Sequence, residues 1–304
     1  MKNWIKNKVY NSKYSVWYDR FKTYRLRKEI LNKGLNSAIE FDLKKHKKSD
    51  TLFILGSALS VMDLTPSDWA EIKKHDTFGF NAWLFHDFVP TYYGIEPMAN
   101  EQLFDSYTGA LSERRKEYEN TPVFVQYQHL KMRNKSFSHK GINQDNLWFN
   151  APFMPNTTNE RVLKKMIDKW ASIQHTDLSE VFHYAGSLSY TITMGYIMGY
   201  KKIVLLGVDL NSSEYYFSHD KVSKLAKDYY QVHVARERRM QRDVKSTHRT
   251  LLKSVTAAYG CLPISIFVEF LRDAIQPKGV ELLIGNDKSA LYPMLDLYKF
   301  SDQE

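Results

Sequence analysis

Residues 201–209 read KKIVLLGVD, and this stretch carries the clearest fold signal in the chain. Four consecutive aliphatic residues are followed by Gly207 and, two residues later, by Asp209. A continuous aliphatic run that ends in a glycine is typical of a parallel strand buried on both faces. We therefore predict that residues 201–209 form a buried strand of a parallel sheet.

The stretch just before this strand, residues 181–200, contains no Asp, Glu, Lys or Arg. It is long enough to span a membrane. It also contains three glycines, several Ser and Thr residues, and His183 near one end. This composition favours a buried helix of a globular domain, and we place that helix at residues 186–199.

Similar apolar runs with polar or glycine endings occur on both sides of this core. Further strands are predicted at 51–56 (TLFILG), 76–81 (DTFGFN), 91–96 (TYYGIE), 122–127 (PVFVQY) and 280–286 (VELLIGN). Helices are predicted at 101–120, 159–171, 247–259 and 289–300, with a loop at 128–158. Strands that alternate with helices predict an α/β fold with a Rossmann-like, mostly parallel sheet and flanking helices.

Two segments stand apart from this alternation. Residues 210–246 are highly charged and lack strong hydrophobic periodicity, so we expect a lid there. Residues 1–48 form a basic, aromatic helical extension that precedes the main domain at 49–304. The predicted architecture is therefore one large domain with a lid and an N-terminal extension.

The net charge of +9 resides in the N-terminal extension. Residues 1–50 hold 14 Lys or Arg against 5 Asp or Glu, so the remainder is neutral. Aromatic residues recur there at helical spacing: Tyr10, Tyr14, Trp17, Tyr18, Phe21 and Tyr24. Aromatic residues flanked by cations suit a helix in the headgroup layer of an anionic membrane. The alternative is a basic helix whose aromatics pack on its own domain. Nucleic acid is excluded as a partner by the neutral remainder and the lack of a recognition motif.

A single cysteine, Cys261, rules out an internal disulfide and favours a cytoplasmic setting. The N-terminus lacks the continuous apolar segment of a secretory signal. We therefore expect a cytoplasmic protein that is peripheral on the inner face of the cell membrane. A homo-oligomer is possible.

Small and polar residues follow the predicted strands, where open parallel sheets bind ligands. They are Gly56, Ser57 and Ser60 after the first strand, Asn81 and Glu96 after the next two, Gly186 and Ser187 before the buried helix, and Asp209. Serine hydroxyls and backbone N–H groups at helix starts can bind phosphate. The signal is weaker than a dinucleotide fingerprint, because GSALS is neither GxGxxG nor a P-loop. For each residue alone, a turn or a helix cap is the competing interpretation.

The chain contains no Asp-x-Asp and no His, Cys or Asp cluster with metal-ligand spacing, so we expect neither a metal nor another cofactor. A departing phosphate would then need hydroxyl, amide or cationic donors. Tyr215 and Tyr216 stand where such donors are wanted, and packing within the lid is their alternative role. His248 is the candidate general base, because burial at a helix start would keep its imidazole neutral. His219, nearer to the tyrosines, is its competitor.

Read in order, these segments resemble the bacterial sialyltransferases of glycosyltransferase family 42. The matching segments are ILGSALSVMDLTPSDW, DTFGFN, YYGIEP, GSLSYTITMGYIMGYKKIVLLGVDL, SSEYYF and STH, which together span most of residues 51–300. The resemblance implies a Rossmann-like domain with a lid, a CMP-activated sialic acid donor, inversion of the anomeric centre and no metal. It places the catalytic base at His248, a phosphate-binding tyrosine at Tyr215, nucleotide contacts at Gly56, Ser60 and Asn81, and a further contact at Ser187.

This chain departs from the family pattern at several donor-site positions. Ser57 and Glu96 stand where the family has asparagines, and Tyr184 stands in place of an arginine. The first family tyrosine falls on Asn211, so Tyr216 would have to replace it. The helix at 264–275 looks inserted. These changes leave the sugar open, and another ulosonic acid could replace sialic acid.

The sequence therefore predicts a metal-independent, inverting glycosyltransferase that uses a CMP-linked sialic or related ulosonic acid. Its acceptor would be a glycan or glycolipid in bacterial surface glycan synthesis, such as lipopolysaccharide or capsule. One alternative is a pyrophosphokinase of the related fold, which would need a metal. The other is a non-catalytic module that binds a nucleotide sugar or a membrane surface.

Overall fold

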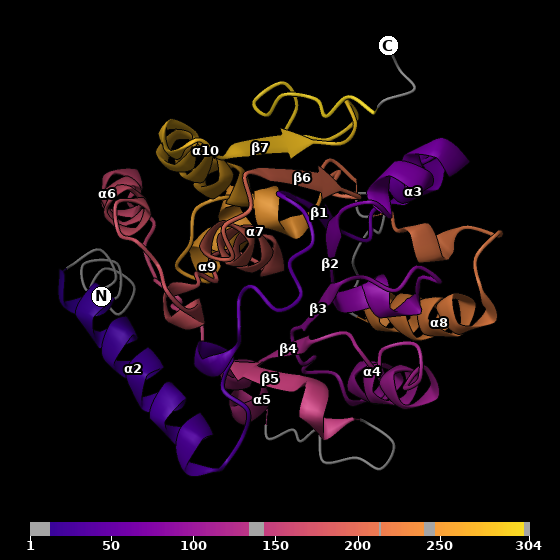
Figure 1. The fold of residues 1–304 in the computed structure, drawn as a ribbon, viewed down its shortest axis with the longest axis horizontal. Coiled ribbons are helices and arrows are strands. Elements are labelled where there is room, and N and C mark those ends of the chain that lie inside the picture. The colour runs from indigo at the N-terminus through magenta and orange to yellow at the C-terminus, as the bar shows by residue number, and fades with distance from the viewer. Residues whose placement is uncertain (1–12, 134–142, 213, 240–246, 301–304) are drawn as a thin grey trace.

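The computed structural model of the chain describes residues 13–133, 143–212, 214–239 and 247–300. Its centre is a seven-stranded sheet of order β5-β4-β3-β2-β1-β6-β7, in which every neighbouring pair is parallel (Figure 1). The strands are β1 (Thr51–Leu55), β2 (Asp76–Phe80), β3 (Tyr92–Ile95), β4 (Val123–Gln126), β5 (Leu147–Asn150), β6 (Lys202–Leu206) and β7 (Glu281–Ile284). The predicted parallel α/β fold is confirmed.

Helices cover both faces of this sheet (Figure 1). One face carries α6 (Glu160–Ala171), α7 (Ser187–Ile197) and α10 (Ile264–Ile275), and the other carries α3 (Pro66–Ile72), α4 (Glu101–Glu113) and α8 (Lys224–Arg239). In strand β1, which lies inside the sheet between β2 and β6, Leu52 and Ile54 belong to the hydrophobic core on the first face, and Phe53 and Leu55 belong to the core on the other face. Successive side chains of a strand point to opposite faces, so one aliphatic strand supplies both cores.

Both elements predicted at the centre of the fold, the buried strand and the buried helix before it, are present in the structure. Strand β6 is buried on both faces, and α7 is a buried helix of 11 residues packed against the sheet. Among the described residues, no helix is long and apolar enough to cross a membrane. Strand β6 pairs with β1 along its whole length, from Thr51 opposite Lys202 to Leu55 opposite Leu206.

Three predictions about local structure were wrong. Strand β5 and all but the first residue of the short helix α5 (Tyr127–Met132) lie within residues predicted as a loop. Helix α8 occupies 16 residues of the segment predicted as a lid, for which no helix was specified. Residues 289–300 form turns instead of a helix. The helix predicted at 247–259 is instead a 3₁₀ turn, Arg249–Leu251, followed by α9 (Lys253–Ala258).

The N-terminal helix α2 (Lys13–Asn32) contacts α5 and the region around β5 (Figure 1). Glu29 Oε1 accepts a hydrogen bond from the Tyr127 hydroxyl at 2.9 Å, and Arg27 Nε donates to the Ala151 carbonyl at 3.2 Å. Polar contacts therefore fix one face of α2 to the sheet edge.

Candidate functional site

Backbone strain gathers at the carboxyl edge of the sheet. Within the described ranges, the non-glycine residues with positive φ are Asn81 at 49°, Ala185 at 58° and Leu210 at 62°. Asn81 directly follows β2, Ala185 precedes α7, and Leu210 follows β6. Such conformations cost free energy and persist where the surrounding structure enforces them, which is common at functional sites. The strained residues therefore lie at the carboxyl edge of the sheet, where the sequence predicts ligand binding.

The ends of β1 and β6 pack backbone against backbone at Gly56 and Gly207. A Cβ on Gly56 would lie 2.3 Å from the Gly207 carbonyl oxygen, and one on Gly207 would lie 2.5 Å from the Gly56 oxygen. Gly56 N–H donates to the Leu206 carbonyl at 2.8 Å, and Ala58 N–H donates to the Gly207 carbonyl at 2.9 Å. Gly56 therefore brings the loop after β1 against the end of β6.

Ser60 and Asp209 lock these two loops together. The Ser60 hydroxyl donates to Asp209 Oδ1 at 2.5 Å and its backbone N–H donates to Oδ2 at 3.2 Å. The Asn286 amide also donates to Ser60 Oγ at 3.3 Å. Asn211, by contrast, is exposed, and its amide donates to the Lys288 carbonyl. The structure brings Ser60 and Asp209 together as predicted, and both side chains hold the loop in place.

Asn81, Glu96 and Ser187 form a second polar group at the same edge. The Asn81 amide donates to Ser187 Oγ at 3.0 Å, and the Ser187 hydroxyl donates to Glu96 Oε2 at 2.9 Å. The backbone N–H of Glu96 donates to Asn81 Oδ1 at 3.0 Å. Ser187 begins α7 directly after Gly186, whose φ is 157°. Three residues from distant parts of the sequence therefore meet as predicted.

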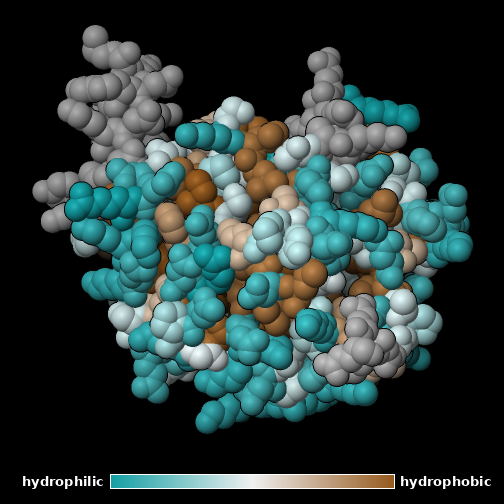
Figure 2. All heavy atoms as spheres, turned by 90° about the horizontal axis from the view of Figure 1, so that it is seen from above, coloured by the Kyte–Doolittle hydropathy of each residue, from teal (hydrophilic) through white to brown (hydrophobic). Residues whose placement is uncertain are grey.

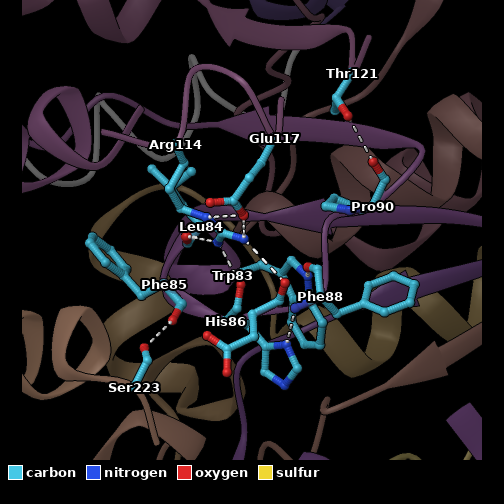
Figure 3. Close-up of polar contacts among 11 residues, drawn as sticks. Trp83, Leu84, Phe85, His86, Phe88, Pro90, Arg114, Glu117, Thr121 and Ser223 are labelled. Atoms are coloured by element: carbon cyan, nitrogen blue, oxygen red, sulfur yellow. Dashed lines mark hydrogen bonds and ion pairs between the residues drawn. The ribbon is translucent and has the colours of Figure 1, made fainter. Parts of the chain in front are cut away.

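The buried Arg114 supports the loop that continues from Asn81 (Figure 3). Its guanidinium donates to the carbonyl oxygens of Leu84 and His86 at 2.6 Å, and to Glu117 Oε2. These carbonyls end the 3₁₀ turn Asn81–Phe85. Arg114 therefore holds the end of the 3₁₀ turn that begins at Asn81.

His129 and His183 extend the group around Glu96. Glu96 Oε1 lies 3.7 Å from His129 Nδ1, and Glu96 Oε2 lies 3.4 Å from His183 Nε2. Arg133 Nη2 lies 3.6 Å from Glu96 Oε1. Burial raises the pKa of Glu96, but the contact with His183 and the charges of His129 and Arg133 hold the pKa below its ordinary value.

The sequence has no cluster with metal-ligand spacing, but the fold brings three potential metal ligands together here. Glu96, His129 and His183 are far apart in the sequence, so no spacing rule could find them. His129 also lies in α5, within residues predicted as a loop. The sequence signals were the place of Glu96 after a predicted strand and that of His183 near the end of the apolar stretch.

The two adjacent tyrosines occupy different environments. Tyr215 is half-buried beside the loop after β1, where it pairs with Ala58 as an isolated bridge. Its ring stacks on Phe217 at 4.8 Å. Tyr216 is 1% exposed, its hydroxyl donates to the Ala82 carbonyl at 2.8 Å, and burial raises its pKa well above the usual value. Of the two tyrosines, Tyr215 is therefore the accessible one, whereas Tyr216 is part of the core, which argues against Tyr216 as a phosphate contact.

His248 lies beside the exit of β6, because its backbone N–H donates to the Leu210 carbonyl at 2.8 Å. Its Nδ1 is 2.8 Å from Thr250 Oγ1. Thr250 in turn reaches the start of α7, with its methyl carbon 3.2 Å from the position of a Cβ on Gly186. Burial, followed by the charge of Arg249, lowers the pKa of His248 to about 4, so the ring is neutral at pH 7.

Two other candidates have structural partners. His219, which follows Tyr216 in the chain, accepts a hydrogen bond at its Nδ1 from the backbone N–H of Lys221 at 3.2 Å. Tyr184 is fully buried, and its hydroxyl donates to the Thr157 carbonyl at 2.7 Å and accepts from the Leu262 N–H at 2.6 Å. Tyr184 therefore tethers the segment that leads into α10.

No family model and no curated protein matches this chain. Among solved structures, it is similar to the sialyltransferase CstII from Campylobacter jejuni in complex with CMP-3FNeuAc, at 15% identity over 82% of this chain and 86% of that chain, with a TM-score of 0.46. It is also similar to the monofunctional alpha-2,3-sialyltransferase Cst-I from Campylobacter jejuni, at 13% identity over 86% of this chain and 84% of that chain, with a TM-score of 0.44. The chain is thus distantly similar in structure to sialyltransferases, the class of protein that its motifs resemble.

Proposed function

We propose that this chain is an inverting glycosyltransferase that takes a sialic or related ulosonic acid from a CMP-linked donor. The observation that carries the proposal is His248, a neutral histidine oriented by Thr250 at the strained carboxyl edge of a parallel sheet. Ligands bind at this edge in open α/β sheets. The sequence motifs supply the class of donor, and the acceptor is proposed to be a bacterial surface glycan or glycolipid.

In the proposed reaction, an acceptor hydroxyl attacks the anomeric carbon of the donor sugar. The new C–O bond forms as the bond to the phosphate oxygen breaks, and CMP leaves. The acceptor proton passes to Nε2 of His248. This requires Nδ1 to carry the ring proton and donate it to Thr250 Oγ1, which lies 2.8 Å away. Nδ1 also accepts the backbone N–H of Thr250 at 3.4 Å, and this longer contact would have to be given up in the active tautomer. Thr250 is thus a positioning residue for the base.

The departing phosphate is proposed to meet the loop after β1 and the hydroxyl of Tyr215. Gly56 and the Ser60–Asp209 pair hold this loop, and Ser57 accepts the backbone N–H of Tyr216 at 3.1 Å. The chain has no Asp-x-Asp, so we propose that protein donors replace magnesium or manganese at the phosphate. Asn81, Glu96 and Ser187 form a polar wall suited to the ribose and the sugar.

The first prediction is release of CMP during transfer in magnesium-free buffer. The assay uses purified protein, a panel of CMP-linked ulosonic acids and glycan acceptors, and measures CMP and product. A non-catalytic module would bind the nucleotide without releasing product. A pyrophosphokinase would consume ATP and need magnesium. Binding of CMP without turnover across the donor panel would contradict the proposed transfer.

The second prediction separates the two tyrosines. Tyr215→Phe should lower turnover by about 10²-fold, because it removes one donor to the developing charge. Tyr216→Phe is the matched control: it removes the hydrogen bond to Ala82 and should cost about 1 kcal/mol of stability with turnover nearly unchanged. The measurements are initial rates and thermal unfolding. A larger loss of turnover in Tyr216→Phe would reverse the assignment.

We also propose that α2 binds an anionic membrane on the cytoplasmic face. Trp17 and Tyr18 are 67% and 61% exposed, and Phe21 and Tyr24 are exposed too. Trp17 stacks on Phe21 at 5.8 Å. The basic residues Lys22, Arg25 and Lys28 are exposed beside these rings. Thr23 and Ile30 are buried on the opposite side of the helix, and Arg27 and Glu29 tie it to the domain, so the aromatic face is turned outward while the helix stays anchored.

The third prediction tests this face with the full-length chain. The triple substitution of Trp17, Phe21 and Tyr24 by Ser should release the protein from vesicles that contain phosphatidylserine, and turnover on a soluble acceptor should persist. Each basic residue near such a surface contributes about 1 kcal/mol, so high salt should also weaken binding. Ile173→Ser, at another exposed apolar residue, is the control. A change in oligomeric mass without a change in vesicle binding would identify the face as a subunit interface instead.

A further inference from the structure

The strongest feature outside the proposed reaction is the group formed by Glu96, His129 and His183. Glu96 directly follows β3, His129 lies in α5 directly after β4, and His183 precedes α7. Each residue offers one ligand atom, and these three atoms all lie within 4.8 Å of one another. Two imidazoles and one carboxylate from three separate segments therefore converge at one point of the sheet edge.

The separations are close to those of a metal site. With ligands about 2.0–2.1 Å from a zinc ion, two ligands of a tetrahedral site lie about 3.3 Å apart. Glu96 Oε2 lies 3.4 Å from His183 Nε2, and the other carboxylate oxygen, Oε1, lies 3.7 Å from His129 Nδ1. The carboxylate therefore faces both imidazoles, and one ligand atom from each residue lies within 4.8 Å of the others.

The histidine nitrogens also lack the partners that buried polar atoms normally have. His129 and His183 are 7% and 8% exposed. Both ring nitrogens of His129, and Nε2 of His183, have no hydrogen-bond partner among the described residues. Buried polar atoms are bonded in the large majority of cases, and an ion is one recognised explanation for an exception. Two of these three atoms, His129 Nδ1 and His183 Nε2, are the ones that face Glu96.

The surroundings include one supporting group and one competitor. The Ser187 hydroxyl donates to Glu96 Oε2 at 2.9 Å and orients the carboxylate, as supporting hydrogen bonds do around metal ligands. Arg133 Nη2 lies 3.6 Å from Glu96 Oε1 and competes for the same charge. A bound cation would therefore displace Arg133 from Glu96.

We propose that Glu96, His129 and His183 bind one divalent transition-metal ion of the zinc class. Imidazole nitrogens select zinc, cobalt or iron(II) over magnesium and calcium, which prefer oxygen ligands. Three protein ligands leave a fourth position open to water or to a substrate oxygen. This site is separate from the loop after β1, so magnesium-free handling of the phosphate and a metal at Glu96 are compatible.

The test measures metal binding by the full-length protein without donor or turnover. Protein freed of metal with a chelator and dialysed is titrated with Co²⁺, whose visible absorption reports coordination, and Zn²⁺ then displaces it. We expect one ion per chain. His129→Gln and His183→Gln should each weaken binding by more than about 10²-fold, beyond the effect of losing a supporting group. His219→Gln should bind as the unchanged protein does.

Two further variants sharpen this test. Glu96→Gln keeps the shape of the side chain but removes its charge. If this variant folds and no longer binds Co²⁺, the result supports the site even where a histidine variant does not fold. Arg133→Gln should tighten Co²⁺ binding by about tenfold, because it removes a positive charge beside the ion. Failure to bind one Co²⁺ at micromolar concentration, or equal binding by the ligand variants, would overturn the proposal. Neither result would bear on the proposed glycosyltransferase activity, because the activity assays test that proposal separately.

Discussion

His248→Ala should lower turnover by about 10²–10⁴-fold, the usual contribution of a general base, while CMP binding stays nearly unchanged. The expected loss follows from the position of the ring at the exit of β6, where Thr250 holds it against the start of α7. The nucleotide contacts proposed for the loop after β1 do not include His248. Steady-state kinetics and CMP titration of the same preparation separate the two effects.

Thr250→Val extends the prediction to the orientation of the base. Valine keeps the shape of threonine but cannot accept the proton of Nδ1. Only the backbone N–H of residue 250 would then contact Nδ1, and this contact favours the tautomer with the proton on Nε2. Turnover should fall, with a smaller effect than His248→Ala because the base itself remains. His219→Ala is the histidine control. Loss of activity in His219→Ala, with His248→Ala unaffected, would show that the base has been misplaced.

The pH dependence gives an independent check on His248. The pKa of His248 is lowered to about 4, mainly by burial, so the basic form is fully present above about pH 5 and is lost as pH falls through 4. The acid limb of kcat/KM should therefore lie well below the 6.5 of an ordinary histidine. A limb near 6.5 that persists in His248→Ala would belong to another group.

The centre of the fold could be predicted because its side chains obey simple burial rules. Strand β6 is aliphatic on both faces, and α7 lacks charges along its whole length, so both had to be buried. Strand β5 escaped prediction because its four residues, LWFN, lie in a polar stretch rich in Asn. Helix α8 escaped because charged residues separate the few apolar contacts, such as Tyr229 on Phe85, that hold it.

The location of the candidate site could be predicted from the sequence more easily than its side-chain contacts could. The rule that ligands bind at carboxyl ends of strands brought Asn81, Glu96 and Ser187 together correctly. It could not show that Tyr216 turns into the core, because adjacent residues of one loop differ only in side-chain direction. Nor could it find His129 and His183, because their proximity depends on tertiary packing alone.

The last prediction concerns the close approach of β1 and β6. Gly207→Ala should destabilise the protein by about 2–5 kcal/mol, from the left-handed backbone and from overpacking. Gly207 has a φ of 62°, and an added Cβ would lie 2.5 Å from both the Gly56 oxygen and a Val61 methyl carbon. The measurement is the midpoint and slope of urea unfolding.

Gly34→Ala separates these two causes. Gly34 has a φ of 64°, close to that of Gly207, but nothing lies within 4 Å of its added Cβ. It should therefore show only the backbone cost of about 1–2 kcal/mol. The difference between the two variants measures the clash at the point where the loop after β1 is held. Equal destabilisation would mean that the strands can separate freely there, and a loop that moves so easily could not place Ser57 and Tyr215 against a departing phosphate.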